Sequence, residues 1–195
     1  MLKEATHLIN AKGLGATSLS DLLAASGAAK GSFYHYFPGK EDLGLAVLAR
    51  ARAQFMEFLE GAVSAETPRE ALGRFFGAVL EVHRGVGFVG GCIFGNTALE
   101  MGDADAAYGR VVAEVFAQWI ERLRLVVSDA QAAGQVRTDL PAGVLAQYIV
   151  SSLEGGIMLS RLKKEEGPLA SCVECLEIFL RDATRADSMS IPDRR

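Results

Sequence analysis

Apolar residues recur at three- and four-residue steps along most of this chain of 195 residues, the spacing that places them on one face of an α-helix. The clearest such stripe lies within residues 112–127, and similar stripes lie within 144–157 and 169–180. No segment shows the two-residue alternation of a half-buried strand, and the chain has no internal repeat. The sequence therefore predicts an all-α fold.

Capping residues and glycines divide the periodic segments into separate helices. Ser18 can accept a hydrogen bond from a backbone N–H near position 21, and Thr67 followed by Pro68 is typical of a second helix start. Gly27 favours the left-handed backbone conformation that ends a helix. We expect helices close to residues 2–12, 19–26, 29–36, 40–61, 68–84, 92–101, 104–133, 141–163 and 168–183.

The helix expected over residues 29–36 has an apolar edge and an outer face of hydrogen-bonding side chains. Phe33 lies one turn before Phe37, so both point inward. A lysine can pair with a phosphate, while hydroxyl, phenol and imidazole groups can bond to phosphates or base edges. The outer face therefore suits the major groove of DNA, and the alternative is a helical hairpin whose polar face is solvated. The outer side chains are Lys30, Ser32, Tyr34, His35 and Tyr36.

The run SGAAKGSFYHYFPGKEDL, over residues 26–43, resembles the signature of the TetR/AcrR family of bacterial transcriptional regulators. The resemblance implies an N-terminal three-helix helix-turn-helix DNA-binding domain at 1–47 and a larger C-terminal helical ligand-binding and dimerisation domain at 48–185. The polar stretch 186–195 is expected to be a disordered tail. The positions expected to bind DNA are Thr17, Ser18, Ala29, Lys30, Ser32, Tyr34, His35, Tyr36 and Lys40.

The same resemblance implies a homodimeric repressor that binds double-stranded DNA at a palindromic operator and is released by a small-molecule effector. It also implies a basic segment ahead of residue 1, so either the start is truncated or DNA is bound with fewer phosphate contacts. Two alternatives are a thiol-based redox or electrophile sensor using Cys92 and a helical enzyme or carrier that does not bind DNA. We expect no enzyme activity, because no Ser–His–Asp arrangement, phosphate-binding loop or metal-binding histidine pair stands out.

Charge and cysteine usage agree with an intracellular DNA-binding protein. Residues 1–52 hold six basic and four acidic residues, whereas the rest of the chain holds 14 and 20, so a slightly basic head precedes an acidic body. Three cysteines are an odd number, which does not favour a disulfide framework and predicts a cytoplasmic location. No signal peptide is evident and no uninterrupted apolar run approaches the ~20 residues that span a bilayer, so no membrane association is expected.

A glycine-rich segment at 85–95 precedes the short helix over 92–101 and predicts a mobile wall for an effector cavity. Asn96 and Glu100 follow Cys92 at one-turn steps on that helix, and a mostly apolar pocket with a few polar groups is the usual form of a small-molecule site. The alternative is that these residues are plain core and capping groups. The residues expected to bind the ligand are Phe88, Cys92, Asn96, Glu100, Phe116, Trp119, Tyr148 and Met158.

The resemblance implies that the last two helices pair with their copies in a second subunit. Cys172 and Cys175 form a Cys-x-x-Cys pair in this region, but zinc would need two further ligands, so we expect no metal and no cofactor. The residues expected at the dimer interface are Tyr148, Gly155, Gly156, Ile157, Cys172, Leu176 and Phe179.

Overall fold

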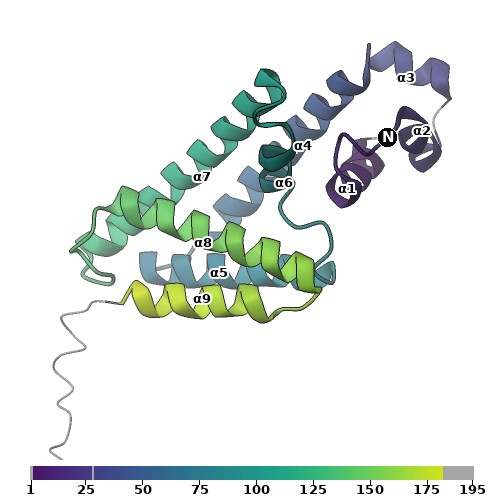
Figure 1. Ribbon diagram of the computed structural model, residues 1–195. Helices are drawn as coiled ribbons and strands as arrows, with labels where there is room; N and C mark the ends of the chain where they lie inside the picture. The colour runs from purple at the N-terminus through teal and green to yellow at the C-terminus, as the bar shows by residue number, and fades with distance from the viewer. Residues whose placement is uncertain (1, 28, 182–195) are drawn as a thin grey trace, which may run out of the picture.

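The computed structural model describes residues 2–27 and 29–181, and within them it contains helices and no strands (Figure 1). The all-α prediction is therefore confirmed, whereas the predicted tail at 186–195 lies outside the described residues. The helices of the described part are α1 Leu2–Lys12, α2 Leu19–Ser26, α3 Lys30–Tyr36, α4 Lys40–Ala62, α5 Pro68–Gly85, α6 Ile93–Met101, α7 Ala106–Ala132, α8 Ala142–Lys163 and α9 Gly167–Phe179.

The helix starts and stops follow the capping residues. Ser18 accepts a hydrogen bond from the N–H of Asp21, and the Asp21 carboxylate accepts one from the N–H of Ser18, so a capping box opens α2. Thr67 opens α5 in the same way, and Gly27 ends α2 with φ at 63°. Helix α9 ends at Phe179, and positions 182–183 of the expected helix lie outside the described residues. The carbonyl of Leu180 accepts a hydrogen bond from the N–H of Arg137.

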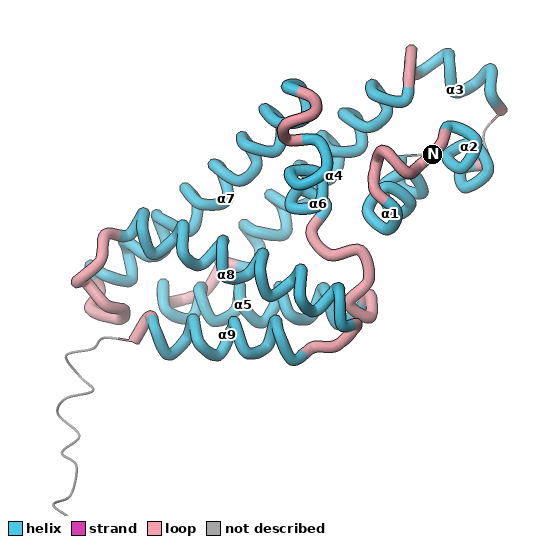
Figure 2. The backbone as a smooth tube through the Cα atoms, in the orientation of Figure 1, coloured by secondary structure: helices cyan, strands magenta, loops and turns pink. Residues whose placement is uncertain are grey.

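The helices form a small head and a larger body joined by one long helix (Figure 1). Helices α1 to α3 lie together at one end, and α4 runs from that head into the body. In the body, α5, α8 and α9 lie side by side, and α7 crosses above them toward the head. Figure 2 shows the loop between α5 and α6 rising from this lower layer to the short helix α6, which lies next to the head.

Two hydrophobic clusters hold these parts together, and one of them is shared by head and body. The head contributes Leu22, Phe33 and Leu43 to the shared cluster, while Phe94 of α6 and Val115 of α7 come from the body. The second cluster lies among α4, α5, α7, α8 and α9. Head and body are therefore not joined by a free hinge, because the hydrophobic core of the head continues into α6 and the first half of α7.

Head and body approach closely at Gly44 on α4. The Tyr108 hydroxyl on α7 donates a hydrogen bond of 2.9 Å to the backbone carbonyl of Glu41, one turn before Gly44. A Cβ at position 44 would overlap that hydroxyl and would lie 3.0 Å from Leu14 Cδ1. Burial, followed by the nearby carboxylate of Glu41, raises the pKa of Tyr108 to about 12. A glycine at position 44 is therefore a packing requirement of the head–body contact.

Among the described residues, α8 is the one helix that is long and apolar enough to cross a membrane by length and composition. A helix at the centre of a globular domain meets the same criterion, and α8 packs against both α7 and α9. About two fifths of its most apolar stretch, 39%, is buried inside the subunit. The expected lack of membrane association stays a prediction.

Candidate nucleic-acid interface and ligand cavity

Helix α3 carries most of the expected DNA-binding side chains, and these are exposed. Phe33 is buried beneath them and packs edge to face against Tyr34, with ring centroids 5.3 Å apart. Tyr36 is exposed, and the centroids of the Tyr36 and His35 rings are 4.9 Å apart. Lys30 and Ser32 lie on the same short helix and are also exposed. The aromatic pairs fix the direction of the surface, while their polar ends remain available to phosphates and bases.

The loop before this surface corrects one expected contact. Thr17 is fully buried, and its hydroxyl donates to the carbonyl of Gly13, so it shapes the loop and does not face DNA. Ser18 is exposed but serves as the cap of α2. Ala29 is the exposed N-cap residue of α3, and the Lys40 ammonium donates to the carbonyl of Gly15 at 3.3 Å. Lys40 keeps further N–H groups that can reach a phosphate.

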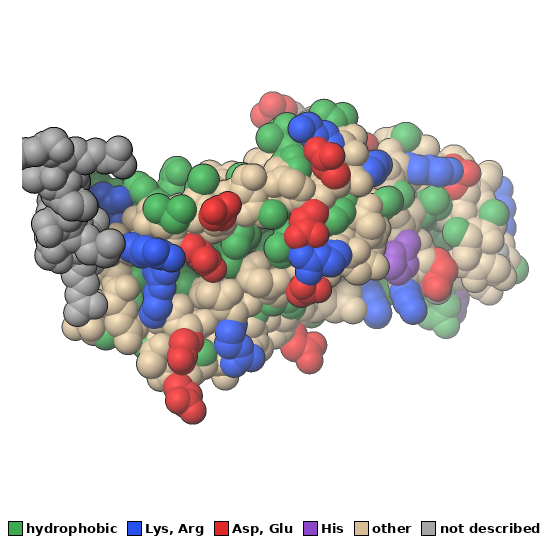
Figure 3. Space-filling model, turned by 90° about the horizontal axis from the view of Figure 1, so that it is seen from below, with side chains coloured by type: hydrophobic (Ala, Val, Ile, Leu, Met, Phe, Trp, Pro, Cys, Tyr) green, Lys and Arg blue, Asp and Glu red, His purple; other side chains and the backbone are tan. Residues whose placement is uncertain are grey.

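Figure 3 views the molecule from below, and the head at the right carries blue basic side chains and a purple histidine. Basic and acidic side chains are mixed over the body on this face. Acidic side chains also lie in the head on this face, so the slightly basic head and acidic body rest on the residue counts of the sequence.

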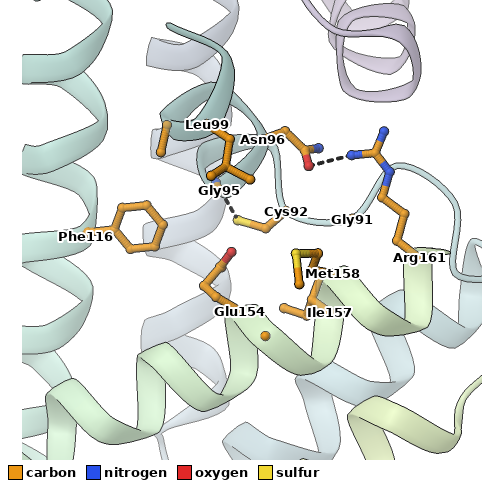
Figure 4. Close-up of a pocket in the computed structure, with 12 residues that line it drawn as sticks. Gly91, Cys92, Gly95, Asn96, Leu99, Phe116, Glu154, Ile157, Met158 and Arg161 are labelled. Atoms are coloured by element: carbon orange, nitrogen blue, oxygen red, sulfur yellow. Dashed lines mark hydrogen bonds between the residues drawn. The ribbon is translucent and has the colours of Figure 1, made fainter. Parts of the chain in front are cut away.

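Two adjoining cavities lie where α4, α5, α6, α7 and α8 meet. Their volumes are about 320 and 280 Å³, and both are lined by Gly91, Cys92, Glu154 and Ile157. The larger cavity is walled mainly by aromatic and aliphatic side chains. These are Phe55, Phe58, Val79, Val82, Ile93, Phe94 and Trp119. The smaller cavity, shown in Figure 4, is lined in addition by Asn96, Leu99, Phe116, Met158 and Arg161.

Five of the eight residues expected to bind a ligand line these cavities, and they are Cys92, Asn96, Phe116, Trp119 and Met158.

The other three expected residues lie elsewhere. Phe88 has a left-handed backbone with φ at 56°, and its ring is buried in the body core instead of lining a cavity. Tyr148 is exposed on α8 and packs against Phe179, with ring centroids 4.9 Å apart. Glu100 is exposed, and its carboxylate accepts hydrogen bonds from the backbone N–H groups of Leu14 and Gly15. Glu100, which was expected to bind the ligand, therefore lines neither of these two cavities.

The buried carboxylate of the cavities is Glu154 on α8, which the sequence interpretation missed. Its Oε1 is buried and accepts no hydrogen bond from any described residue. Its Oε2 lies against Gly95, where a Cβ would overlap it. The available signal was one acidic residue between Leu153 and Ile157, inside the buried stripe of α8. An acidic residue inside such a stripe needs a functional or structural reason, because burial of a carboxylate is costly.

Burial raises the pKa of Glu154 above its usual value of 4.5, and a hydrogen bond with Cys92 opposes this shift. Because the folded pKa is raised, the folded protein holds this proton more tightly than the unfolded chain. The resulting stability is present below pH 4.5 and is lost as the pH rises through the folded pKa.

We therefore expect Glu154→Gln to gain thermal stability relative to the wild type as the pH rises from acid to neutral. Melting temperatures of the two proteins across this range would measure the gain. Glu57→Gln, on the exposed face of α4, makes the same charge change outside both cavities and should follow the wild type. A constant difference between Glu154→Gln and wild type would contradict the raised pKa.

Cys92 caps α6, and its sulfur accepts a hydrogen bond from the N–H of Gly95 at 3.5 Å. Burial, followed by the charge of Glu154, raises the pKa of the Cys92 thiol well above its usual range. A raised pKa keeps the group as a thiol, whereas redox-sensing cysteines react as thiolates. The position of Cys92 thus favours a wall of the cavity over a reactive site.

Asn96 connects the cavity wall to the head. Its amide nitrogen donates to Asn10 Oδ1 of α1 at 2.9 Å and to the carbonyl of Gly90 at 2.7 Å. Arg161 of α8 donates to Asn96 Oδ1 and, at 3.3 Å, to the carbonyl of Ala11 (Figure 4). The same side chains therefore line the smaller cavity and hold the end of α1.

Several residues expected at a dimer interface pack inside the subunit instead. Ile157 lines both cavities and is buried, and Leu176 belongs to the body core. Gly156 lets α9 approach, because a Cβ there would lie 3.0 Å from the Cys172 sulfur. Phe179 is half-buried between Tyr148 and the Arg137 guanidinium, which lies 4.2 Å from its ring centroid.

The outer side of α8 and α9 nevertheless remains apolar. Figure 3 shows apolar side chains gathered toward the left, where α9 ends. Gly155 lies on α8 with nothing within 4 Å of a Cβ built there. Within residues 2–27 and 29–181, no group of three or more histidine, cysteine or acidic side chains could hold a metal ion. The large exposed apolar residues of α8 and α9 are Val144, Tyr148, Met158, Leu159, Leu162 and Ile178.

Comparison with known proteins gives two family matches. Residues 1–47 match the description "Bacterial regulatory proteins, tetR family", and residues 68–176 match "Tetracyclin repressor-like, C-terminal domain". The HTH-type transcriptional repressor DhaR of Mycobacterium sp. (strain GP1) is 26% identical over 87% of this chain and 84% of its own length. The transcriptional regulator AcuR of Cereibacter sphaeroides is 30% identical over 88% of this chain and 79% of its own length.

Solved structures share the arrangement of head and body. The regulatory protein TetR from Rhodobacter sphaeroides superposes with a TM-score of 0.87 at 28% identity, covering 91% of this chain and 95% of that one. The reduced form of NemR from E. coli superposes with a TM-score of 0.81, covering 92% and 94% of the two chains. At a sequence identity of 20%, this similarity concerns the fold alone.

Proposed function

Because this chain belongs to the TetR family and is a DNA-binding transcriptional regulator, we propose that it is a cytoplasmic homodimeric repressor, released from a palindromic operator when a small-molecule effector binds in the body. The observation that carries this proposal is the shared wall of cavity and head. Asn96 and Arg161 line the smaller cavity and also bond to α1. We assign residues 1–47 to DNA binding and 48–185 to effector binding and dimerisation.

In the proposed complex, α3 lies in the major groove with Lys30, Tyr34 and Tyr36 toward the DNA. Two such helices in a dimer would read the two halves of a palindrome, and the spacing of the half-sites would depend on the distance between the heads. Dimerisation through the exposed apolar side of α8 and α9 would bury the side chains that the single subunit leaves exposed. This arrangement uses α3 of the head for recognition and α8 and α9 of the body for assembly.

The switch would act through the elements that enter both cavity and head. Helix α4 contributes Phe55 and Phe58 to the larger cavity and continues without a break into the head. Helix α6 contributes Asn96 to the smaller cavity, and its Glu100 binds the loop before α2. An effector changes the population of the DNA-binding state only by its difference in affinity between two states. A ligand that moves α6 or α4 therefore favours a different position of the head.

The thiol-sensor alternative is less well supported. It needs a Cys92 thiolate, and both burial and Glu154 disfavour that form. A reversible ligand, in contrast, needs only the existing cavities.

Lys30→Ala should weaken binding to all DNA sequences and reduce the slope of log affinity against log salt by about one, because one phosphate contact is lost. Fluorescence anisotropy with DNA from upstream of the gene, measured at several salt concentrations, tests this. Arg181→Ala removes one positive charge from an exposed side chain just after α9, whose end lies away from the head (Figure 1), and serves as the control. An unchanged salt slope in Lys30→Ala would refute the proposed placement of α3.

A further inference from the structure

Glu154 gives the cavities a definite chemical preference. Its Oε1 is buried at the junction of the two cavities and lacks a hydrogen-bond donor among the described residues. Gly95 makes room for Oε2, since a Cβ at position 95 would overlap that atom. In Figure 4 the Glu154 carboxylate points from α8 toward the start of α6. A carboxylate held in a space shaped for it, with one oxygen unsatisfied, calls for a donor from a ligand.

The basic groups that line the cavities are engaged elsewhere. Arg161 donates to Asn96 and to the carbonyl of Ala11, and Figure 4 shows it directed away from Glu154. His83 Nδ1 lies 2.8 Å from the carbonyl of Val79, so its ring is held against its own helix. Neither group donates to Glu154 Oε1. The Cys92 thiol hydrogen-bonds to the Glu154 carboxyl group, but neither Arg161 nor His83 supplies a cation to balance its charge.

Aromatic rings surround the space beside this carboxyl group. The rings of Phe55 and Trp119 meet edge to face with centroids 5.0 Å apart, and Phe116 stacks on Trp119 at 5.9 Å. Trp119 is 2% exposed, and its indole N–H has no acceptor among the described residues. Aromatic faces attract cations, and their area binds apolar groups. The walls therefore complement a molecule that joins a positive charge to a hydrocarbon body.

We propose that the effector is a small organic ammonium ion, a protonated primary or secondary amine carrying an aromatic or aliphatic group. Its N–H donates to Glu154 Oε1, and its apolar part lies against Phe55, Phe116 and Trp119. Volumes of about 320 and 280 Å³ suit a single small molecule. An oxygen atom elsewhere in the ligand would accept the Trp119 N–H. This inference rests on the proposed function, since it takes the cavities as the effector site.

Three probes of nearly equal shape test the charge preference: phenethylamine, phenethyl alcohol and phenylacetate. Binding to the full-length protein in phosphate buffer, which contains no amine, is followed by calorimetry and by Trp119 fluorescence. Phenethylamine should bind roughly ten- to a hundredfold more tightly than the alcohol, the difference expected for a charged hydrogen bond, and phenylacetate should bind least. Equal affinity for amine and alcohol, or no binding of phenethylamine, would overturn the proposal.

Variants locate the interaction. Glu154→Gln should reduce phenethylamine affinity by roughly ten- to a hundredfold and leave the alcohol unchanged, whereas Glu57→Gln should leave both unchanged. Gly95→Ala places a methyl group where the carboxylate lies and should also weaken amine binding. Circular dichroism shows whether each variant is folded. Retention of amine affinity in a folded Glu154→Gln protein would contradict the assignment.

Operator binding separates this inference from the proposed function. If phenethylamine binds through Glu154 but does not release DNA, the ammonium site stands and the effector role fails. If the wild-type protein does not bind DNA from its own upstream region, the proposed repressor function fails whatever the cavities bind.

Discussion

Gly44→Ala is expected to lower the free energy of unfolding by about 1–3 kcal/mol, the usual cost of overpacking a filled core. The new Cβ would overlap the Tyr108 hydroxyl and press on Leu14, so α7 and the head must move apart. That movement should also weaken operator binding, because the position of α3 depends on this contact. Chemical denaturation and fluorescence anisotropy would measure the two effects.

A second substitution makes this prediction specific. Tyr108→Phe removes the hydroxyl that the new methyl group meets, at the cost of its hydrogen bond to Glu41. The double variant with Gly44→Ala should therefore lose less stability than the two single losses combined. Gly61→Ala, on the same helix but with open space around its Cβ, should be neutral or stabilising. Additive losses in the double variant would show that position 44 does not act through Tyr108.

Ile178→Glu is expected to convert the proposed dimer into monomers, with a dimer dissociation constant raised by roughly a hundredfold or more, because a charge would be buried without a partner. Ile178 is 57% exposed in the subunit, so the substitution should not disturb folding. A monomer can occupy only one half of a palindrome, so operator affinity should fall as well. Analytical ultracentrifugation and anisotropy on the same samples would follow both losses.

The matched control is Val86→Glu at the end of α5, where the exposed fraction is 53%. This substitution adds the same charge at a position that is not on α8 or α9, and the variant protein should remain dimeric. If Ile178→Glu still sediments as a dimer, assembly occurs through a different surface. If the wild-type protein is itself a monomer, the proposal that it binds a palindromic operator as a dimer fails.

The sequence predicted the helices well because their signals are local. Ser18, Thr67 and Gly27 act within one turn of themselves, so the ends they mark follow from neighbouring residues. The buried side of α3 was also predictable, because Phe33 and Phe37 are one turn apart. Thr17 was misplaced because its burial depends on a turn that its own hydroxyl stabilises through Gly13.

The cavity and the interface were less predictable because they depend on contacts between distant helices. Glu100 and Glu154 are both acidic residues among apolar neighbours, and only the packing of α6 between head and α8 decides which of them is buried. Helix α8 is apolar on more than one side, so its periodicity could not separate the side facing α9 from the side facing outward. Ile157 was assigned to the wrong side of α8 for this reason, and Leu176 of α9 was likewise assigned to an interface although it packs in the body core.

Some residues of the cavity walls also bond to the head and others do not, and this difference bears on how the ligand specificity of the regulator could change. Phe58, Val79 and Met158 line the cavities without hydrogen bonds to the head, so substitutions there can alter specificity while the operator response is preserved. Asn96 and Arg161 are more constrained, because their replacement also removes hydrogen bonds to α1. New ligand specificities should therefore arise first on the α4, α5 and outer α8 walls, and directed evolution can be confined to those positions.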